Sequence, residues 1–317
     1  MIAFHAPLAT AGLFFLRPTG GDSRSDPSRS GNDSVDELCF AHSHRGKSSM
    51  AISMDATIDR RLPAQAGDEG FFLGAAVCMT LVIIAGFSTQ LAMGRSTFYS
   101  PPLVHAHAIM FMGWVTIYLL QNIFVATDRM ALHRRLGWVA AGWIIPMIVL
   151  GFAVTIAMVR RGQVPFFFRP LHFLVFDPLS LVTFATLTGS AILLRNNTDW
   201  HRRLHLCGMA MLMGPGFGRL LPMPLLEPWA WEASFVGGLI FPIAGIVADL
   251  RRTGHVHPAW RWGILTMMCG FLVIEAVTYS SAGQAVYRAI TADSPGAHVP
   301  ALQFSAPPSG PPVTGRG

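Results

Sequence analysis

Long apolar segments alternate with short polar loops over most of this chain. Each segment is close to the roughly 20 residues that a helix needs to cross a bilayer, and the first three contain no Asp, Glu, Lys or Arg. The pattern predicts an all-α, polytopic membrane bundle of about seven transmembrane helices. The predicted spans are 71–94, 103–126, 136–159, 171–194, 204–226, 229–249 and 262–283.

Prolines and glycines interrupt several of these spans. The fifth contains the most, and because neither residue suits a helix interior, we expect it to be the least regular. Single prolines should kink the third, fourth and sixth spans, where the bundle interior must satisfy the freed backbone groups. The residues are Gly214, Pro215, Gly216, Gly218, Pro222 and Pro224 in the fifth span, and Pro146, Pro178 and Pro242 in the others.

The spans define a membrane domain of residues 65–284. Residues 1–64 are rich in Ser, Gly, Asp and Arg without periodicity, which predicts a disordered N-terminal extension. An alternative is that translation starts at Met50 or Met54 and that the upstream segment is an artefact of the gene model. The proline-rich tail of residues 285–317 is also predicted to be disordered.

Composition supports the membrane class. Apolar residues make up 52% of the 317 residues and charged residues only 13%, against about 25% charged in soluble domains. The net charge is +6, but most basic residues are arginines in short loops, whereas a nucleic-acid surface needs a contiguous patch. The charge therefore indicates membrane topology, with the lipid bilayer as partner and no nucleic acid.

Arginines are distributed unequally between two alternating sets of loops. The set that begins with the N-terminal flank holds eleven, the opposite set holds five, and basic residues mark the cytoplasmic side. The prediction is an N-terminus inside and a C-terminus outside. The first set is Arg60, Arg61, Arg129, Arg134, Arg135, Arg195, Arg202, Arg203, Arg251, Arg252 and Arg261; the second is Arg95, Arg160, Arg161, Arg169 and Arg288.

Most ionisable side chains within the predicted spans fall at one depth. Counting about 1.5 Å per residue along each helix places Asp177, Arg219 and Glu275 in the outer third of the membrane. Such charges cost about 2.5–3.5 kcal/mol each at the centre of a span, so they should face the interior and pair. Near the outer surface lie Glu232, His105, His107 and His172.

Two interpretations of this outer layer remain open. One is a structural ion pair, with Asp177 against Arg219, that holds helices together. The other is a polar cavity that opens to the outside and binds a ligand. His107 is the histidine expected to face inward, because it shares a polar stripe with Trp114, Tyr118 and Gln121, whereas His105 lies about 200° away around the helix.

Histidines also gather near the predicted cytoplasmic side, where His201 and His205 are one turn apart. Histidines at matched depths on different helices are what a bis-histidine haem requires. The candidate pairs are His107 or His105 with His172 near the outside, and His133 with His201 or His205 near the inside. The alternative for His133 and His201 is that their His-Arg-Arg segments are anchors beside lipid headgroups.

The chain resembles an uncharacterised family of bacterial predicted membrane proteins with a domain of unknown function. The resemblance rests on His105 or His107, on Leu-His-Arg-Arg-Leu-Gly at 132–137, on His-Arg-Arg-Leu at 201–204 and on Arg-Leu-Leu-Pro at 219–222. His205 departs from the family, which usually has an apolar residue or methionine there. The resemblance covers roughly residues 103–225 and implies the fold and a bacterial cytoplasmic membrane location, without an activity. A weaker analogy links the paired histidines to haem-binding cytochrome b families.

No catalytic signature accompanies these features. The sequence has no phosphate-binding loop, dinucleotide fingerprint or zinc-protease motif, and its four cysteines are isolated. The first hypothesis is therefore a membrane protein that binds haem b and transfers electrons, with a membrane redox partner and no metal beyond the haem iron. The alternative is a cofactor-free transporter, sensor or assembly factor that uses the outer polar cavity.

Overall fold

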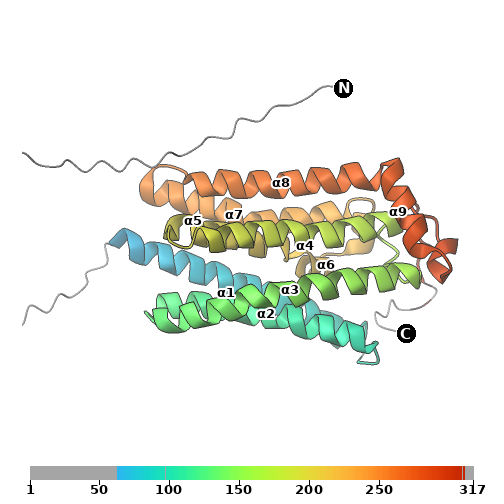
Figure 1. The fold of residues 1–317 in the computed structure, drawn as a ribbon, viewed down its shortest axis with the longest axis horizontal. Coiled ribbons are helices and arrows are strands. Elements are labelled where there is room, and N and C mark those ends of the chain that lie inside the picture. Colours follow the sequence, from blue (N-terminus) through green and yellow to red (C-terminus); the bar gives the residue numbers. More distant parts are fainter. Residues whose placement is uncertain (1–62, 97, 309, 311–317) are drawn as a thin grey trace, which may run out of the picture. The chain divides into compact units, whose positions relative to one another are not determined.

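The protein is described by a computed structural model over residues 63–96, 98–308 and 310, and helices are its only regular elements there (Figure 1). Residues 1–62, which hold nearly all of the predicted disordered extension and both alternative start sites, lie outside the described residues. The helices are α1 (Pro63–Ala92), α2 (Pro102–Ala126), α3 (Met130–Arg160), α4 (Pro170–Leu193), α5 (Thr198–Met211), α6 (Gly214–Leu220), η1 (Met223–Leu226), α7 (Ala230–Thr253), α8 (Pro258–Thr278), α9 (Ser281–Thr291) and η2 (Pro295–His298).

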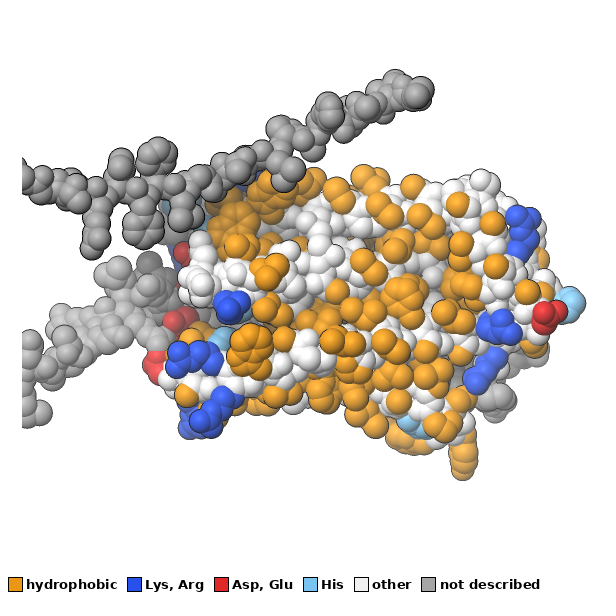
Figure 2. All heavy atoms as spheres, viewed as in Figure 1, with side chains coloured by type: hydrophobic (Ala, Val, Ile, Leu, Met, Phe, Trp, Pro, Cys, Tyr) orange, Lys and Arg blue, Asp and Glu red, His pale blue; other side chains and the backbone are white. Residues whose placement is uncertain are grey.

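Six of these helices are long and apolar enough to cross a membrane: α1 from Asp68 onward, α2, α3, α4, α7 and α8. Their outward side chains are large and apolar, such as Leu81 on α1, Ile145 on α3 and Leu265 on α8, each more than half exposed. Apolar side chains cover the middle of the bundle and basic ones gather toward its two ends (Figure 2). Length, composition and surface together indicate a multi-pass membrane protein.

The fifth predicted span, 204–226, is not one continuous helix. α5 ends at Met211, the short helix α6 begins at Gly214, and the one-turn η1 follows. The break falls where Gly214, Pro215 and Gly216 follow one another, because proline removes a backbone donor and glycine weakens a helix interior. By contrast α3, α4 and α7 continue through Pro146, Pro178 and Pro242.

Proline and glycine also set several helix ends. Pro102, Pro170 and Pro258 lie in the first turns of α2, α4 and α8. A backbone N–H there has no acceptor within the helix, so proline loses no hydrogen bond. Gly254, at φ +73, ends α7. The sequence-predicted spans therefore agree with the helices over most of their length, but α1, α3, α7 and α8 begin or end several residues beyond the apolar segments.

The helices alternate in direction, so the bundle has two ends (Figure 1). We call the end at which α1, α3, α5 and α8 begin the basic end, and the opposite one the far end. In the described residues, the basic end carries the greater share of the loop arginines. They are Arg129, Arg134, Arg135, Arg195, Arg202, Arg203, Arg251, Arg252 and Arg261, against Arg95, Arg160, Arg161, Arg169 and Arg288 at the far end.

α4 is the most buried of the six membrane-spanning candidates and lies between α3, α5 and α8. α1 packs against α2 and closely against α6. A Cβ added at Gly86 would lie 2.7 Å from the carbonyl oxygen of Gly216, so α1 and α6 can approach this closely only because both residues lack side chains. This contact holds α6 against the bundle although it is too short to span by itself.

The prediction of a disordered tail over 285–317 is wrong for its first part. Ser280 caps α9 by accepting a hydrogen bond from the Gly283 N–H at 2.9 Å. The chain then folds over the far end, where Tyr287, Ile290, Ala301 and Leu302 join an apolar cluster with α3 and α4. The carbonyl of Ala301 accepts from the N–H of Leu171 at 2.8 Å. The few apolar residues of this segment are enough to order it because they pack against the apolar surface that α3 and α4 already provide.

Candidate functional site

Three histidines meet at the basic end. His133 is in the first turn of α3, and His201 and His205 are one turn apart on α5. The ring centroids of His133 and His201 are 6.2 Å apart and those of His201 and His205 are 4.7 Å apart, each pair nearly perpendicular. The structure therefore brings the inner set of sequence-predicted histidines together, and we call it the histidine cluster.

Two of these rings are held in place by backbone carbonyls. Nδ1 of His201 lies 2.8 Å from the carbonyl oxygen of Ala191, and Nδ1 of His133 lies 3.4 Å from that of Gln121. A carbonyl oxygen can only accept, so Nδ1 carries the proton in both rings and Nε2 keeps its lone pair. A donor–carbonyl contact of this kind typically orients a histidine that binds a metal through its other nitrogen.

The histidine cluster lies beside both polar and basic groups. Oε1 of Gln121 is buried and has no hydrogen-bond partner. Arg134 and Arg135, which follow His133, are exposed at the same end. In the described part of the chain, no group of three or more His, Cys, Asp or Glu side chains has the geometry to hold a metal ion.

Arg219 interacts electrostatically with both Asp177 and His107 near the far end. The Asp177 carboxylate also has a hydrogen-bond donor on a neighbouring helix. It accepts a hydrogen bond from Thr155 on α3. Asp177 and Arg219 thus interact electrostatically, and the direct ion pair between them stays a prediction.

Arg219 and His107 have other contacts. Nη1 of Arg219 donates to the Pro215 carbonyl at 2.9 Å, and its guanidinium lies 4.0 Å from the ring centroid of Phe87. His107 stacks on Phe111 with ring centroids 4.2 Å apart, and its Nδ1 is buried without a partner. His105, on the other face of α2, is exposed and contacts the carbonyl of Phe98 at 3.1 Å.

His172 and Glu275 form a separate pair between α4 and α8. Nε2 of His172 lies 3.0 Å from Oε1 of Glu275, and the imidazole is 5% exposed. The ring of Trp231 packs edge-on against His172 at 5.3 Å. Glu232, the next residue after Trp231, has a buried Oε2 without a partner. The outer histidine thus bonds to a carboxylate and does not approach His107 or His105.

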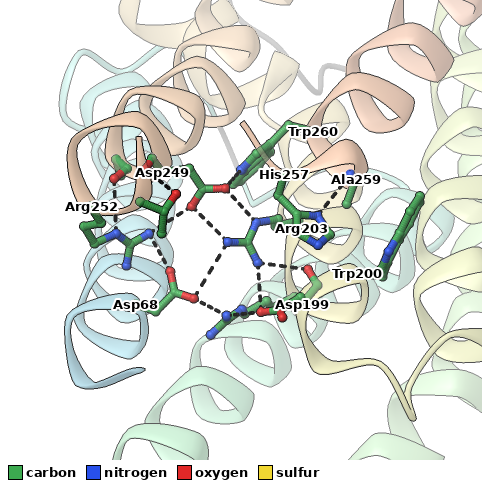
Figure 3. Close-up of polar contacts among 12 residues, drawn as sticks. Asp68, Asp199, Trp200, Arg203, Asp249, Arg252, His257, Ala259 and Trp260 are labelled. Carbon is green, nitrogen blue, oxygen red and sulfur yellow. Dashed lines mark hydrogen bonds and ion pairs between the residues drawn. The ribbon is translucent and has the colours of Figure 1, made fainter. Parts of the chain in front are cut away.

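The most extensive polar cluster is one that the sequence analysis missed. At the basic end, Asp68 of α1, Asp199 of α5 and Asp249 of α7 alternate with Arg202, Arg203 and Arg252 (Figure 3). Three carboxylates balance three guanidinium groups, so the cluster is neutral although it lies in the arginine-rich end. We call it the ionic network.

Arg203 is at the centre of the ionic network. Its Nε and Nη2 donate to the two carboxylate oxygens of Asp249 at 3.0 and 2.9 Å, and its Nη1 donates to Asp199 at 3.2 Å. The Trp260 indole N–H of α8 donates to the same carboxylate of Asp249 at 2.7 Å. Side-chain exposure is 6% for Arg203 and 2% for Asp249, so the network ties α1, α5, α7 and α8 together inside the bundle.

The sequence holds one signal for this network, which is the presence of Asp249 within a predicted span. An acidic residue one turn before Arg252 in an apolar segment needs a partner. Comparisons of the chain with protein-family models, with curated proteins and with solved structures each found no match. The proposed resemblance therefore stays a prediction, and the residues and geometry of this chain carry the functional argument.

Proposed function

We propose that this membrane protein binds a b-type haem at the histidine cluster and transfers electrons in a bacterial cytoplasmic membrane. The observation that carries the proposal is the facing pair of imidazoles, His133 on α3 and His201 on α5, with ring centroids 6.2 Å apart. Each has Nδ1 on a backbone carbonyl, which leaves both Nε2 lone pairs for one iron.

The residues around this pair fit the rest of a haem group. His205 packs edge-on against His201 and fixes the angle of that ring. The exposed side chains of Arg134 and Arg135 stand at the same end and can pair with two carboxylates, as arginines do with acidic groups. Haem, when bound, would supply one-electron redox chemistry. The chain's own part is to orient two imidazoles and to place the carboxylate-binding arginines toward the membrane surface.

The test is the absorption spectrum of detergent-purified protein from haem-replete cells. We expect a Soret band and, after reduction, the bands of a six-coordinate b-type haem. The variants His133→Ala and His201→Ala should each remove or shift these bands while the protein still inserts in the membrane. His105→Ala is the matched control, because His105 is exposed on α2 and contacts only the Phe98 carbonyl. A wild-type protein without a Soret band would overturn the proposal.

A second candidate function rests on Arg219. Its guanidinium lies over the Phe87 ring of α1, donates to the Pro215 carbonyl of α6 and interacts electrostatically with Asp177 of α4. Charged side chains in a membrane bundle face cavities and mark ligand sites. The cofactor-free alternative is therefore a site near the far end that binds a small anion through Arg219, with His107 offering a free Nδ1 beside it.

Thermal unfolding in detergent distinguishes this alternative. Small carboxylates or phosphate at millimolar concentration should raise the unfolding temperature of the wild type, and Arg219→Gln should abolish the rise. Arg288→Gln is the matched control, because Arg288 is exposed at the same end. Equal responses of both variants would exclude the anion site. The haem spectrum is independent of this result, since the two sites lie at opposite ends of the bundle.

A further inference from the structure

A histidine caps the first turn of α8. His257 directly precedes this helix, and its Nδ1 accepts a hydrogen bond from the backbone N–H of Ala259 at 3.1 Å (Figure 3). Ser, Thr, Asp and Asn usually occupy this position, and none of them changes its charge between about pH 5 and 8. An imidazole accepts only through a nitrogen that carries no proton. The cap at His257 therefore exists only while the ring is neutral.

Water cannot replace this cap. Pro258, the first residue of α8, has no N–H, so the N–H of Ala259 is the first donor of the helix. Ala259 and Trp260 are completely buried, and a buried donor without an acceptor is unfavourable. The closed form of this turn therefore depends on the side chain of His257.

The first turn of α8 is connected to the ionic network. Trp260 is its third residue, and the indole N–H of Trp260 donates to Oδ2 of Asp249 at 2.7 Å. The backbone N–H of Trp260 bonds in turn to the carbonyl of His257 at 3.1 Å. Oδ2 of Asp249 also accepts from Nε of Arg203. A change in the first turn of α8 therefore reaches the central ion pair of the network through one side chain.

The imidazole of His257 lies against α5 and among charges of both signs. Its ring packs edge-on against that of Trp200, with ring centroids 5.8 Å apart. Two guanidinium groups disfavour a proton on the ring and two carboxylates favour it, whereas the neighbouring His255 and Arg261 are exposed. The four charged groups are Arg202, Arg203 and Asp199 on α5 and Asp249 on α7. Burial, followed by the Arg203 charge, lowers the pKa of His257 below its ordinary value of 6.5, so the ring is neutral at neutral pH.

We propose that His257 is a pH sensor, and that its protonation opens the first turn of α8 and withdraws Trp260 from the ionic network. A protonated Nδ1 is a donor that faces the N–H of Ala259, so the cap is lost. The new positive charge also lies at the N-terminus of a helix, where the macrodipole disfavours cations. Asp199 is the carboxylate that can receive the imidazolium, because its side chain is 52% exposed whereas that of Asp249 is 2% exposed.

Acidic pH is the signal for this sensor. The open form binds the proton more tightly than the closed form, so the advantage of the closed form is complete above pH 6.5 and is lost as the pH falls through the lowered pKa of His257. The sensor needs neither haem nor an anion at Arg219. It lies at the basic end and responds to the pH on the side of the membrane that this end faces.

Hydrogen–deuterium exchange of the full chain in detergent tests the proposal. Exchange of the segment 257–265 is measured at about pH 7.5 and about pH 5, on either side of the ordinary histidine pKa, and is corrected for the effect of pH on the chemical exchange rate. We expect acid to increase the opening of this segment about five-fold, the effect of one lost helix cap. His257→Asn keeps a cap acceptor without a titrating group, so the segment should stay protected at both pH values. His257→Ala lacks the cap and should exchange faster at both.

His255→Asn is the matched control, because His255 is an exposed histidine of the same loop, and this variant should keep the acid response of the wild type. Equal protection of the wild-type segment at the two pH values, or an acid response in His257→Asn equal to that of the wild type, would overturn the proposal. Exchange at C2 of the imidazole measures the pKa of His257 without any variant. A pKa at or above 6.5 would contradict the sensor, since the capping ring would then not resist protonation.

Discussion

Arg203 and Asp249 form a bidentate ion pair that joins α5 to α7 at the basic end, and both side chains are almost completely buried (Figure 3). Parallel N–H···O bonds between a guanidinium and a carboxylate are among the strongest side-chain contacts. The Trp260 indole N–H donates a further hydrogen bond to Oδ2 of Asp249, with an N···O distance of 2.7 Å. The pair therefore combines full hydrogen bonding with exclusion of water, the combination that makes loss of one partner costly.

Arg203→Gln should destabilise the protein by about 3–5 kcal/mol, because it leaves the buried Asp249 carboxylate without its main partner. Asp249→Asn should cost a similar amount, and the double variant should cost less than the sum. The measurement is chemical unfolding in detergent for the double-mutant cycle. Arg261→Gln, an exposed arginine of the same end, should change stability by less than about 0.5 kcal/mol. Additive losses in the cycle would show that the two side chains do not bond.

The spans could be predicted because their signal is local. A run of apolar residues bounded by Pro102 or Pro170 specifies both a helix and its first turn without reference to any other segment. The break between α5 and α6 was likewise visible in Gly214, Pro215 and Gly216. The remaining differences are at helix ends, where α3 and α7 extend past the apolar segments into the polar loops.

The ionic network could not be predicted because its pairs are distant in sequence. Asp249 is 46 residues from Arg203, and helical periodicity shows which face a residue occupies but not which helix lies opposite. The arginines of this end were therefore interpreted only as topology signals. The same limit applies to Asp177, whose hydrogen bond comes from the Thr155 hydroxyl on a different helix.

Asp177 should couple energetically to Thr155 more strongly than to Arg219. A hydrogen bond to a charged group contributes about 1.5–3 kcal/mol, whereas charges beyond ion-pair distance interact less. Two double-mutant cycles compare Asp177→Asn with Thr155→Val and with Arg219→Gln, each by unfolding in detergent. A larger coupling energy for the Arg219 cycle would mean that the carboxylate and the guanidinium bond directly in the membrane.

The basic end should face the cytoplasm. The greater number of loop arginines at that end is the physical reason, since positively charged loops are retained inside. A reporter that is active only outside the cytoplasm, fused after Gly310, should therefore be active. The same reporter inserted after Asp128, in the loop between α2 and α3, should be silent. The opposite pattern would reverse the orientation and place the histidine cluster on the outer side.

Tyr287 should hold the folded C-terminal segment on the far end. Its hydroxyl is within hydrogen-bond distance of two backbone carbonyls, 3.3 Å from that of Gly296 and 3.2 Å from that of Val299. Tyr287→Phe removes the donor from both, so we expect a loss of about 1 kcal/mol in the free energy of unfolding. Tyr99→Phe is the matched control, because Tyr99 is 92% exposed and its hydroxyl can bond to water in the folded and the unfolded state alike.

The pH dependence gives this prediction a second readout. Burial raises the pKa of the Tyr287 hydroxyl above the ordinary value of 10.0, so the folded state binds the proton more tightly than the unfolded state. The contribution of Tyr287 to stability is therefore complete below pH 10 and is lost as the pH rises through the raised pKa. The difference in unfolding free energy between wild type and Tyr287→Phe should shrink at alkaline pH. A difference that stays constant, or a Tyr287→Phe protein as stable as Tyr99→Phe, would show that residues after α8 do not dock on the bundle.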